Sequence, residues 1–141
     1  MIRRLDHIAI AVPDLDRAIR RFSEDFGLTF EGSEAVPSQS TSTAFFPIGP
    51  AHVELVTPLD GQGAIAKFLE NRPGGLHHLC FSTDDIDADV ARLKAKGWEF
   101  LSPAPTAGAH GCRVIFVHPR SCDGVLIELS QPAVDTSGDV S

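Results

Sequence analysis

The sequence predicts an α+β fold made of two βαβββ modules, at approximately 1–60 and 74–132. Three observations support this prediction. Short apolar stretches alternate between strand and helix periods. Glycine and proline separate these stretches at turn positions. The first half of the chain also resembles the second at a nearly constant offset. Neither half could cover the inner face of its own sheet, so we expect the two modules to pair in a single domain, 1–141.

The internal similarity begins in the first strand of each half. Residues 5–9 (LDHIA) correspond to residues 76–80 (LHHLC), which aligns His7 with His78 at an offset of 71 residues (78 − 7). Further along, residues 53–55 (VEL) correspond to residues 127–129 (IEL), which aligns Glu54 with Glu128 at an offset of 74 (128 − 54). A few inserted loop residues account for the difference, and surface connections tolerate them easily.

The first half reads as one strand, one helix and three strands. Residues 5–12 are apolar and β-branched, and Pro13 ends them. A helix over roughly 15–25 has an apolar stripe, with Asp14 or Asp16 as its cap and Gly27 at its end. Strands are expected at roughly 28–35, 41–48 and 51–57, with a turn at 49–50.

The second half repeats this order. We expect a strand at 76–82, a helix at 85–96 that ends at Gly97, and strands near 98–101, 112–118 and 125–130. A further amphipathic helix at 63–71 is expected to bridge the modules. Residues 133–141 are mostly small and polar, which is typical of a flexible tail.

Composition argues against several classes of function. The net charge is −7, and no run of lysine or arginine is long enough to follow a nucleic-acid backbone. Neither a secretory leader pattern nor an apolar run of about 20 residues is present, so we expect a cytoplasmic protein without membrane partners. The three cysteines lack C-x-x-C spacing, which predicts free thiols rather than a cysteine-based zinc site.

The duplicated histidines and glutamates are candidate metal ligands. If the halves are related by approximate twofold symmetry, His7, Glu54, His78 and Glu128 can converge on one point. Two imidazoles and two carboxylates suit a divalent ion with open positions for substrate or water. Alternation in residues 125–129 puts Glu128 on the face opposite to its apolar neighbours, where burial needs a partner.

A single histidine or glutamate in a strand is more often structural or solvated than a metal ligand, but four at duplicated positions favour the ligand interpretation. The other histidines are weaker candidates. His77 is expected to face away from the site as a structural or supporting residue, and His52 to face solvent. His110 lies on a glycine-flanked loop that suits ligand contact and a simple turn equally well, while His118 is expected to be structural.

Several segments resemble methylmalonyl-CoA epimerases, a family of the vicinal-oxygen-chelate (glyoxalase/bleomycin-resistance/dioxygenase) superfamily. They are residues 5–15 (LDHIAIAVPDL), 65–69 (IAKFL), 75–78 (GLHH), 108–111 (GAHG), 116–120 (FVHPR) and 124–129 (GVLIEL). The first segment is general to the superfamily, and the last two are more specific.

The resemblance implies a cup-shaped, eight-stranded mixed sheet with helices on the outside, usually in a homodimer. It implies a divalent metal, with cobalt as the first choice and Mn, Ni, Zn or Mg as alternatives, held by His7, Glu54, His78 and Glu128. The implied substrate is an acyl-CoA, methylmalonyl-CoA or a close branched acyl-CoA. Its R and S forms would interconvert by α-proton abstraction through a metal-stabilised enolate. Glu128 would be one base, with a pKa tuned toward neutrality, and Glu54 the remaining candidate for the second.

One segment departs from the family. Residues 37–43 (PSQSTST) are rich in serine and threonine where these epimerases typically have Glu or His followed by Gly. Thr43 aligns with a further family glutamate and cannot act as a base at neutral pH. Thr43 is therefore predicted to bind substrate rather than to act as a base, and His110 is also predicted to bind substrate. Arg120, with Lys67 and Arg72, is a candidate for binding the CoA phosphates. Solvated surface charges are an equally good interpretation of these basic residues.

Three other functions fit the fold. A lactoylglutathione lyase (glyoxalase I) would share the two-His, two-Glu site. A non-catalytic binding or resistance protein of the same superfamily typically lacks the ligand set. An extradiol dioxygenase needs two histidines with one carboxylate and usually has a longer chain.

Overall fold

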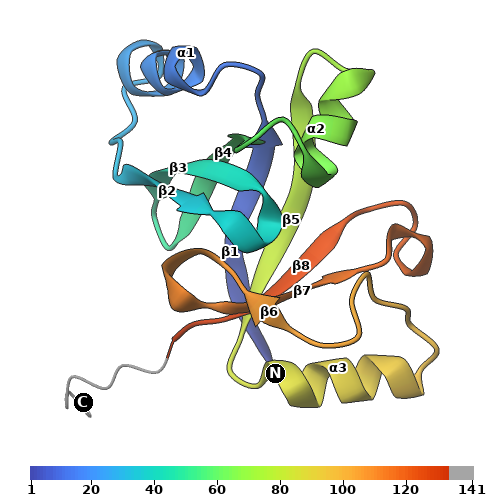
Figure 1. Cartoon of the computed structure of the whole chain (residues 1–141). Helices are drawn as coiled ribbons and strands as arrows, with labels where there is room; N and C mark the ends of the chain where they lie inside the picture. The colour runs from blue at the N-terminus through green and yellow to red at the C-terminus, as the bar shows by residue number, and fades with distance from the viewer. Residues whose placement is uncertain (134–141) are drawn as a thin grey trace.

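The structure is a computed structural model that describes residues 1–133, and it contains one eight-stranded mixed sheet in the order β2-β3-β4-β1-β5-β8-β7-β6 (Figure 1). Apart from Ala133, the predicted flexible tail at 133–141 lies outside the described residues. The strands are β1 (Ile2–Ala11), β2 (Gly32–Val36), β3 (Thr41–Ile48), β4 (Ala51–Pro58), β5 (Gly75–Thr83), β6 (Thr106–Ala107), β7 (Arg113–Val117) and β8 (Ile127–Gln131).

The helices are α1 (Leu15–Arg20), α2 (Gly63–Glu70) and α3 (Ile86–Ala95). A π-helical turn, Arg21–Asp25, extends α1, and 3-10 turns occupy Pro37–Gln39, Ala109–Gly111 and Pro119–Ser121. Equivalent aspartates cap α1 and α3: Asp14 accepts a hydrogen bond from Arg17 N, and Asp85 accepts one from Ala88 N, each at 3.1 Å. No helix within residues 1–133 is both long and apolar enough to cross a membrane.

The sheet is built from two modules of the same topology. In the first, β1 pairs in parallel with β4, and β2, β3 and β4 are antiparallel; in the second, β5 pairs in parallel with β8, and β6, β7 and β8 are antiparallel. The antiparallel β1–β5 pair joins the modules. Its register sets His7 opposite Cys80 and His78 opposite Ala9. Ala9 and Cys80 are themselves equivalent in the repeat, so the pairing is symmetric between the modules. The predicted α+β fold of paired βαβββ modules is confirmed.

The convex face of the sheet is covered by α1 and α3. Under α1 lie Phe46 and Leu55, both fully buried. Under α3 lie Ile115 and Leu129, each 1% exposed. Burial of each such side chain contributes about 1.5–3 kcal/mol. The bridging helix α2 differs, because its Ile65 packs on the other face, against Ala11 and Val56.

One predicted strand is wrong. Residues 98–101 form no strand, and only an isolated bridge joins Phe100 to Val117. The edge of the second module is instead the two-residue strand β6. Pro103 and Pro105 lie between the bridge and β6, and proline cannot donate a ladder hydrogen bond. In the first module, β2 also starts later than expected, at Gly32.

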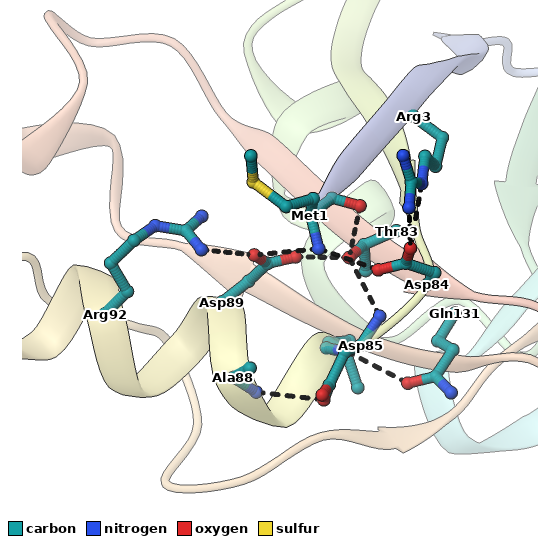
Figure 2. A network of polar contacts seen from close by, with 10 residues as sticks. Met1, Arg3, Thr83, Asp84, Asp85, Ala88, Asp89, Arg92 and Gln131 are labelled. Atoms are coloured by element: carbon teal, nitrogen blue, oxygen red, sulfur yellow. Dashed lines mark hydrogen bonds and ion pairs between the residues drawn. The ribbon is translucent and has the colours of Figure 1, made fainter.

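A polar network joins the start of β1 to the end of β5 and to α3 (Figure 2). The amino group of Met1 lies 2.7 Å from the carboxylate of Asp84. Asp89 on α3 is fully buried, lies 2.6 Å from the guanidinium of Arg92, and accepts a hydrogen bond from the hydroxyl of Thr83. Both partners offset the unfavourable burial of the Asp89 charge. The network fixes the end of the β1–β5 pair that lies away from α2.

Candidate metal centre

The concave face of the sheet lines a cavity that both modules share. Residues of β1, β2, β3, β4, β5, β7 and β8 line it, and so do Ala64 and Ile65 of α2. Its polar lining residues are Asp6, Gln39, Thr41, Thr43, His77, His110, Cys112 and Ser130, together with the four predicted metal ligands His7, Glu54, His78 and Glu128. The structure therefore brings together the four residues that the internal repeat singled out.

Three of these four side chains form a compact cluster. His7 Nε2 and His78 Nε2 are 3.2 Å apart, and each lies 3.2 Å from Glu128 Oε1. Two donors bound to one ion at about 2.1 Å, at tetrahedral or octahedral angles, are about 3.0–3.4 Å apart. His7 and Glu128 are 6% and 4% exposed, which limits competition from bulk water. The donor set and its spacing fit a divalent ion.

Glu54 lies next to this cluster rather than inside it. Its Oε2 is 2.9 Å from His7 Nδ1, the ring nitrogen that does not belong to the triangle of donors. Glu54 comes from β4 and Glu128 from β8, on opposite sides of the central β1–β5 pair. The two carboxylates therefore enter the cavity from opposite modules. The role of Glu54 as a fourth ligand stays a prediction.

The residue before each histidine also faces the cavity, because the β1–β5 ladder is bulged at both places. Leu5 pairs with Phe81 and His7 with Cys80, so Asp6 is an extra residue in β1. On β5, Leu76 pairs with Ile10 and His78 pairs with Ala9, so His77 is an extra residue between them. Both Asp6 and His77 line the cavity. Strict alternation predicted that His77 faces away, and the bulge is why that prediction is wrong.

Each extra residue contacts the histidine that follows it. Asp6 Oδ2 lies 2.8 Å from His7 Nδ1, and His77 Nδ1 lies 2.8 Å from His78 Nδ1. In both cases the contact uses the Nδ1 atom, which leaves the Nε2 atoms facing Glu128. The predicted supporting role of His77 fits this arrangement, while Asp6 was not singled out from the sequence.

The ionisation of the site follows from these contacts. Burial lowers the pKa of His7, but hydrogen bonds with Asp6, Cys80, Glu128 and Glu54 outweigh burial and raise this pKa above its ordinary value of 6.5. Without an ion, His7 therefore carries a proton on each of its two ring nitrogens at neutral pH. The proton on Nε2 must leave before Nε2 can bind an ion, while Nδ1 keeps its proton and donates a hydrogen bond.

Glu128 has the opposite shift from the one predicted. Burial raises its pKa, but hydrogen bonds from His7 and His78 outweigh burial and lower the pKa to about 2. The sequence predicted a base tuned toward neutrality. The flanking imidazoles instead keep Glu128 fully ionised at neutral pH, which is the state needed for a ligand or a proton acceptor.

His77 and Cys80 are both neutral at physiological pH. Burial, with a smaller contribution from the nearby His78, lowers the pKa of His77 to about 4. Burial likewise raises the pKa of the Cys80 thiol well above its ordinary value. Three acidic side chains, those of Asp6, Glu54 and Glu128, therefore surround the single protonated ring of His7, and this excess of acidic groups favours a cation.

The three predicted substrate-binding residues differ in position. Thr43, only 3% exposed, lines the cavity from β3. His110 lines it from the loop after β6, where its ring packs on Phe45 with ring centroids 4.4 Å apart. Arg120 is not among the lining residues, and its guanidinium pairs with Glu99 at 3.0 Å. Roles in substrate binding stay predictions for all three.

Of the remaining histidines, His118 is structural as predicted, whereas His52, expected to face solvent, has a side chain that is only 30% exposed. His52 lies 3.7 Å from Glu31 and is not among the lining residues. His118 Nδ1 accepts a hydrogen bond from Arg120 N and so caps a 3-10 turn. Sequence reasoning missed Gln39 and Ser130 as lining residues. The spacing of Ser130, two residues after Glu128 on the same strand, was a signal that could have found it.

Comparison with known families agrees with this geometry. Residues 6–116 match the family described as the Glyoxalase/Bleomycin resistance protein/Dioxygenase superfamily. The chain belongs to this superfamily. The matched residues run from the start of the candidate metal centre into β7, and they include three of the four predicted ligands, all except Glu128.

Within the superfamily, the chain is similar to epimerases of acyl-CoA thioesters. It is 43% identical to the mitochondrial methylmalonyl-CoA epimerase of Homo sapiens, over 91% of this chain and 73% of the relative. It is 41% identical to the ethylmalonyl-CoA/methylmalonyl-CoA epimerase of Cereibacter sphaeroides, over 93% and 99%. A solved methylmalonyl-CoA epimerase in complex with methylmalonyl-CoA and NH4+ has a TM-score of 0.90 at 34% identity, over 95% and 97% of the two chains.

The lactoylglutathione lyases are more distant. The chain is 31% identical to a lactoylglutathione lyase of Arabidopsis thaliana over 92% of its own length, which is only 44% of that relative. The predicted resemblance to methylmalonyl-CoA epimerases is confirmed. The similarity to these epimerases also favours an isomerase over the glyoxalase alternative.

Proposed function

We propose that this chain is a metal-dependent epimerase that interconverts the R and S forms of methylmalonyl-CoA or a close branched acyl-CoA. The observation that carries the proposal is the cluster of His7 Nε2, His78 Nε2 and Glu128 Oε1, with all three separations at 3.2 Å. The similarity to methylmalonyl-CoA epimerases over more than nine-tenths of the chain supports the choice of substrate.

His7, His78 and Glu128, with Glu54 as fourth ligand, would hold the ion, with cobalt as the first choice. A bound divalent ion would supply Lewis-acid stabilisation of the negative charge that develops on the thioester and carboxylate oxygens when the α-proton leaves. All four ligand side chains line one cavity, so a substrate that enters it can reach the ion from the open side.

Two carboxylates from opposite modules suit inversion at the α-carbon. Inversion requires removal of the α-proton from one face and return of a proton to the other. Glu128 reaches the cavity from β8 and Glu54 from β4, with the β1–β5 pair between them. Glu128 is ionised at neutral pH and can accept a proton, and Glu54 is the proposed partner. The substrate α-carbon would lie between them.

The acyl group is set by residues that differ from the family pattern. Gln39, Thr41 and Thr43 line the cavity within the segment 37–43. A relative that acts on both ethylmalonyl-CoA and methylmalonyl-CoA, by its name, is 41% identical to this chain. We therefore include ethylmalonyl-CoA among the proposed substrates. Homodimeric assembly and cytoplasmic location remain predictions.

Loss of the α-deuteron tests the proposal directly. Labelled methylmalonyl-CoA in ordinary water should lose deuterium and racemise in the presence of the enzyme, and ethylmalonyl-CoA should be tested beside it. The glutathione hemithioacetal of methylglyoxal serves as the rival substrate. Turnover of the hemithioacetal with no deuterium loss from either acyl-CoA would overturn the proposal in favour of a glyoxalase.

A further inference from the structure

We propose that Asp6 and His77 are matched positioning residues, each of which fixes the ring of the histidine ligand that follows it. The inference rests on the proposed metal site and deepens it. Asp6 and His77 are repeat equivalents, at the same offset of 71 residues (77 − 6) that relates His7 to His78. Each module therefore places two side chains, and not only a single ligand, at this point of the repeat.

The backbone explains how these two positions can do this. A regular ladder would point residues 6 and 7 to opposite faces of the sheet. The extra residue in β1 at Asp6, and the extra residue in β5 at His77, break this alternation just before each histidine. Both members of each pair then face the same cavity. Bulges that turn an additional side chain toward a site commonly adjoin active sites.

On β1, the orienting group is a carboxylate. Asp6 Oδ2 accepts the hydrogen bond of His7 Nδ1 at 2.8 Å, and Glu54 Oε2 lies slightly farther from the same nitrogen, at 2.9 Å. The other oxygen of Asp6 lies 3.2 Å from the guanidinium of Arg4, which also donates to Pro50 O at 2.6 Å. Arg4 therefore holds the carboxylate in place from the far side. Once the ring of His7 is neutral, with Nδ1–H bound to Asp6, its lone pair is on Nε2, which faces Glu128.

On β5, the orienting group is a neutral imidazole. His77 Nδ1 lies 2.8 Å from His78 Nδ1, so one of the two nitrogens donates and the other accepts. The ring of His77 is itself held by Phe68, whose centroid is 5.1 Å away in an edge-to-face arrangement, and Arg72 packs over the outer face of Phe68. If His78 is the donor, its lone pair is on Nε2, the atom that faces Glu128.

The two modules therefore support their ligands with different strength. A carboxylate acceptor makes a histidine ligand a better electron donor than a neutral acceptor does. His7 is accordingly the stronger ligand of the pair. We expect replacement of Asp6 to weaken ion binding more than replacement of His77, although both residues occupy equivalent positions.

Substitutions that keep or remove the acceptor atom test the inference. His77→Asn retains an acceptor near the position of Nδ1, whereas His77→Phe retains the packing on Phe68 and removes the acceptor. Asp6→Asn retains an oxygen, whereas Asp6→Leu does not. His52→Phe and Glu31→Gln are matched controls, because they remove a histidine and a carboxylate that are not among the residues lining the cavity.

The first measurement is the affinity for Co2+, by competition with a chromophoric chelator, with thermal unfolding of the metal-free protein as a check on folding. Supporting residues typically change metal affinity about 10–100-fold. We expect a loss in this range for His77→Phe and Asp6→Leu, a smaller loss for His77→Asn and Asp6→Asn, and none for the controls. If a leucine or phenylalanine variant fails to fold, the asparagine variant at that position decides.

The second measurement detects the hydrogen bonds themselves. In the Zn2+-loaded protein, the Nδ1 protons of His7 and His78 should give two slowly exchanging imidazole N–H resonances. Asp6→Asn should shift one of them and His77→Phe should abolish the other. Unchanged Co2+ affinity in both His77→Phe and Asp6→Leu would overturn the inference, as would equal losses in His77→Phe and His77→Asn.

The wild-type protein separates this inference from the proposed function. If wild type binds no divalent ion, the proposed function fails and the inference fails with it. If wild type binds Co2+ tightly and exchanges the α-proton, but the variants match it in affinity and in their N–H resonances, only the positioning role is overturned.

Discussion

His7 Nε2 and His78 Nε2 lie 3.2 Å apart, although 71 residues separate the two histidines in the chain. The antiparallel β1–β5 pair brings them together, because each histidine lies opposite the residue two positions after the other histidine. Glu128 completes the cluster from β8, which pairs in parallel with β5. One donor of the cluster thus comes from the first module and two come from the second.

Replacement of Glu128 should abolish proton exchange. Glu128→Gln keeps the size of the side chain but removes its negative charge, which is needed both to hold a cation and to accept the α-proton. We expect deuterium loss from labelled methylmalonyl-CoA to fall at least about 10²–10⁴-fold, the usual contribution of a general base. Glu31→Gln, at a half-exposed position, is the control. Near wild-type exchange in Glu128→Gln would contradict the assigned role.

Glu54 should affect inversion more than exchange. If Glu54 and Glu128 work on opposite faces of the α-carbon, Glu54→Gln leaves one base able to remove and return the proton on its own face. We expect exchange from one epimer to persist while racemisation falls at least about 10²-fold. The rates are compared by mass spectrometry for deuterium and by circular dichroism for stereochemistry, at full metal occupancy. An equal fall in both rates for both epimers would argue against this division.

Ion binding should release protons at neutral pH. In the absence of an ion, hydrogen bonds to the surrounding side chains raise the pKa of His7 well above 6.5, so its ring is doubly protonated at pH 7, and an ion can bind Nε2 only after the Nε2 proton leaves. Affinity should therefore rise with pH and weaken as the pH falls, by about tenfold per unit for each proton displaced. Calorimetric titration in two buffers of different ionisation enthalpy counts the released protons. Binding with no proton release, and an affinity that is independent of pH, would contradict the shift.

The stability of the fold should depend on the core between the sheet and α1. Leu55 is fully buried there, and Leu55→Ala removes buried methyl groups and leaves a cavity. We expect a loss of about 2–5 kcal/mol in the free energy of unfolding, measured by urea denaturation. Leu76→Ala is the control, since Leu76 is 71% exposed and should change stability by no more than about 0.5 kcal/mol. Comparable losses at both positions would contradict this account of the core.

The fold, and the gathering of four acidic and imidazole side chains in one cavity, could be predicted because the internal repeat contains the signal for both. His7 with His78, and Glu54 with Glu128, stand at equivalent points of two similar segments, and alternation correctly put Glu128 on the face opposite to Leu129. These signals depend on local spacing, which a single sequence contains in full.

Asp6, His77 and the edge of the second module could not be predicted in the same way. Alternation assumes a regular ladder, and the two bulges depend on pairing between β1 and β5 that local spacing does not encode. The strand expected at 98–101 had suitable residues, but the prolines that follow confine the edge to β6. The low pKa of Glu128 likewise depends on two imidazoles that only the folded chain brings near.

The most direct test of the central claim is the metal content of protein purified without chelators. Wild type should contain about one divalent ion per chain, lose it and its proton-exchange activity on chelation, and regain both when Co2+ is added. His78→Ala should contain none, while His52→Ala should match wild type. Full proton-exchange activity in wild type stripped of metal, or full metal occupancy in His78→Ala, would contradict the proposal that these two modules share one ion.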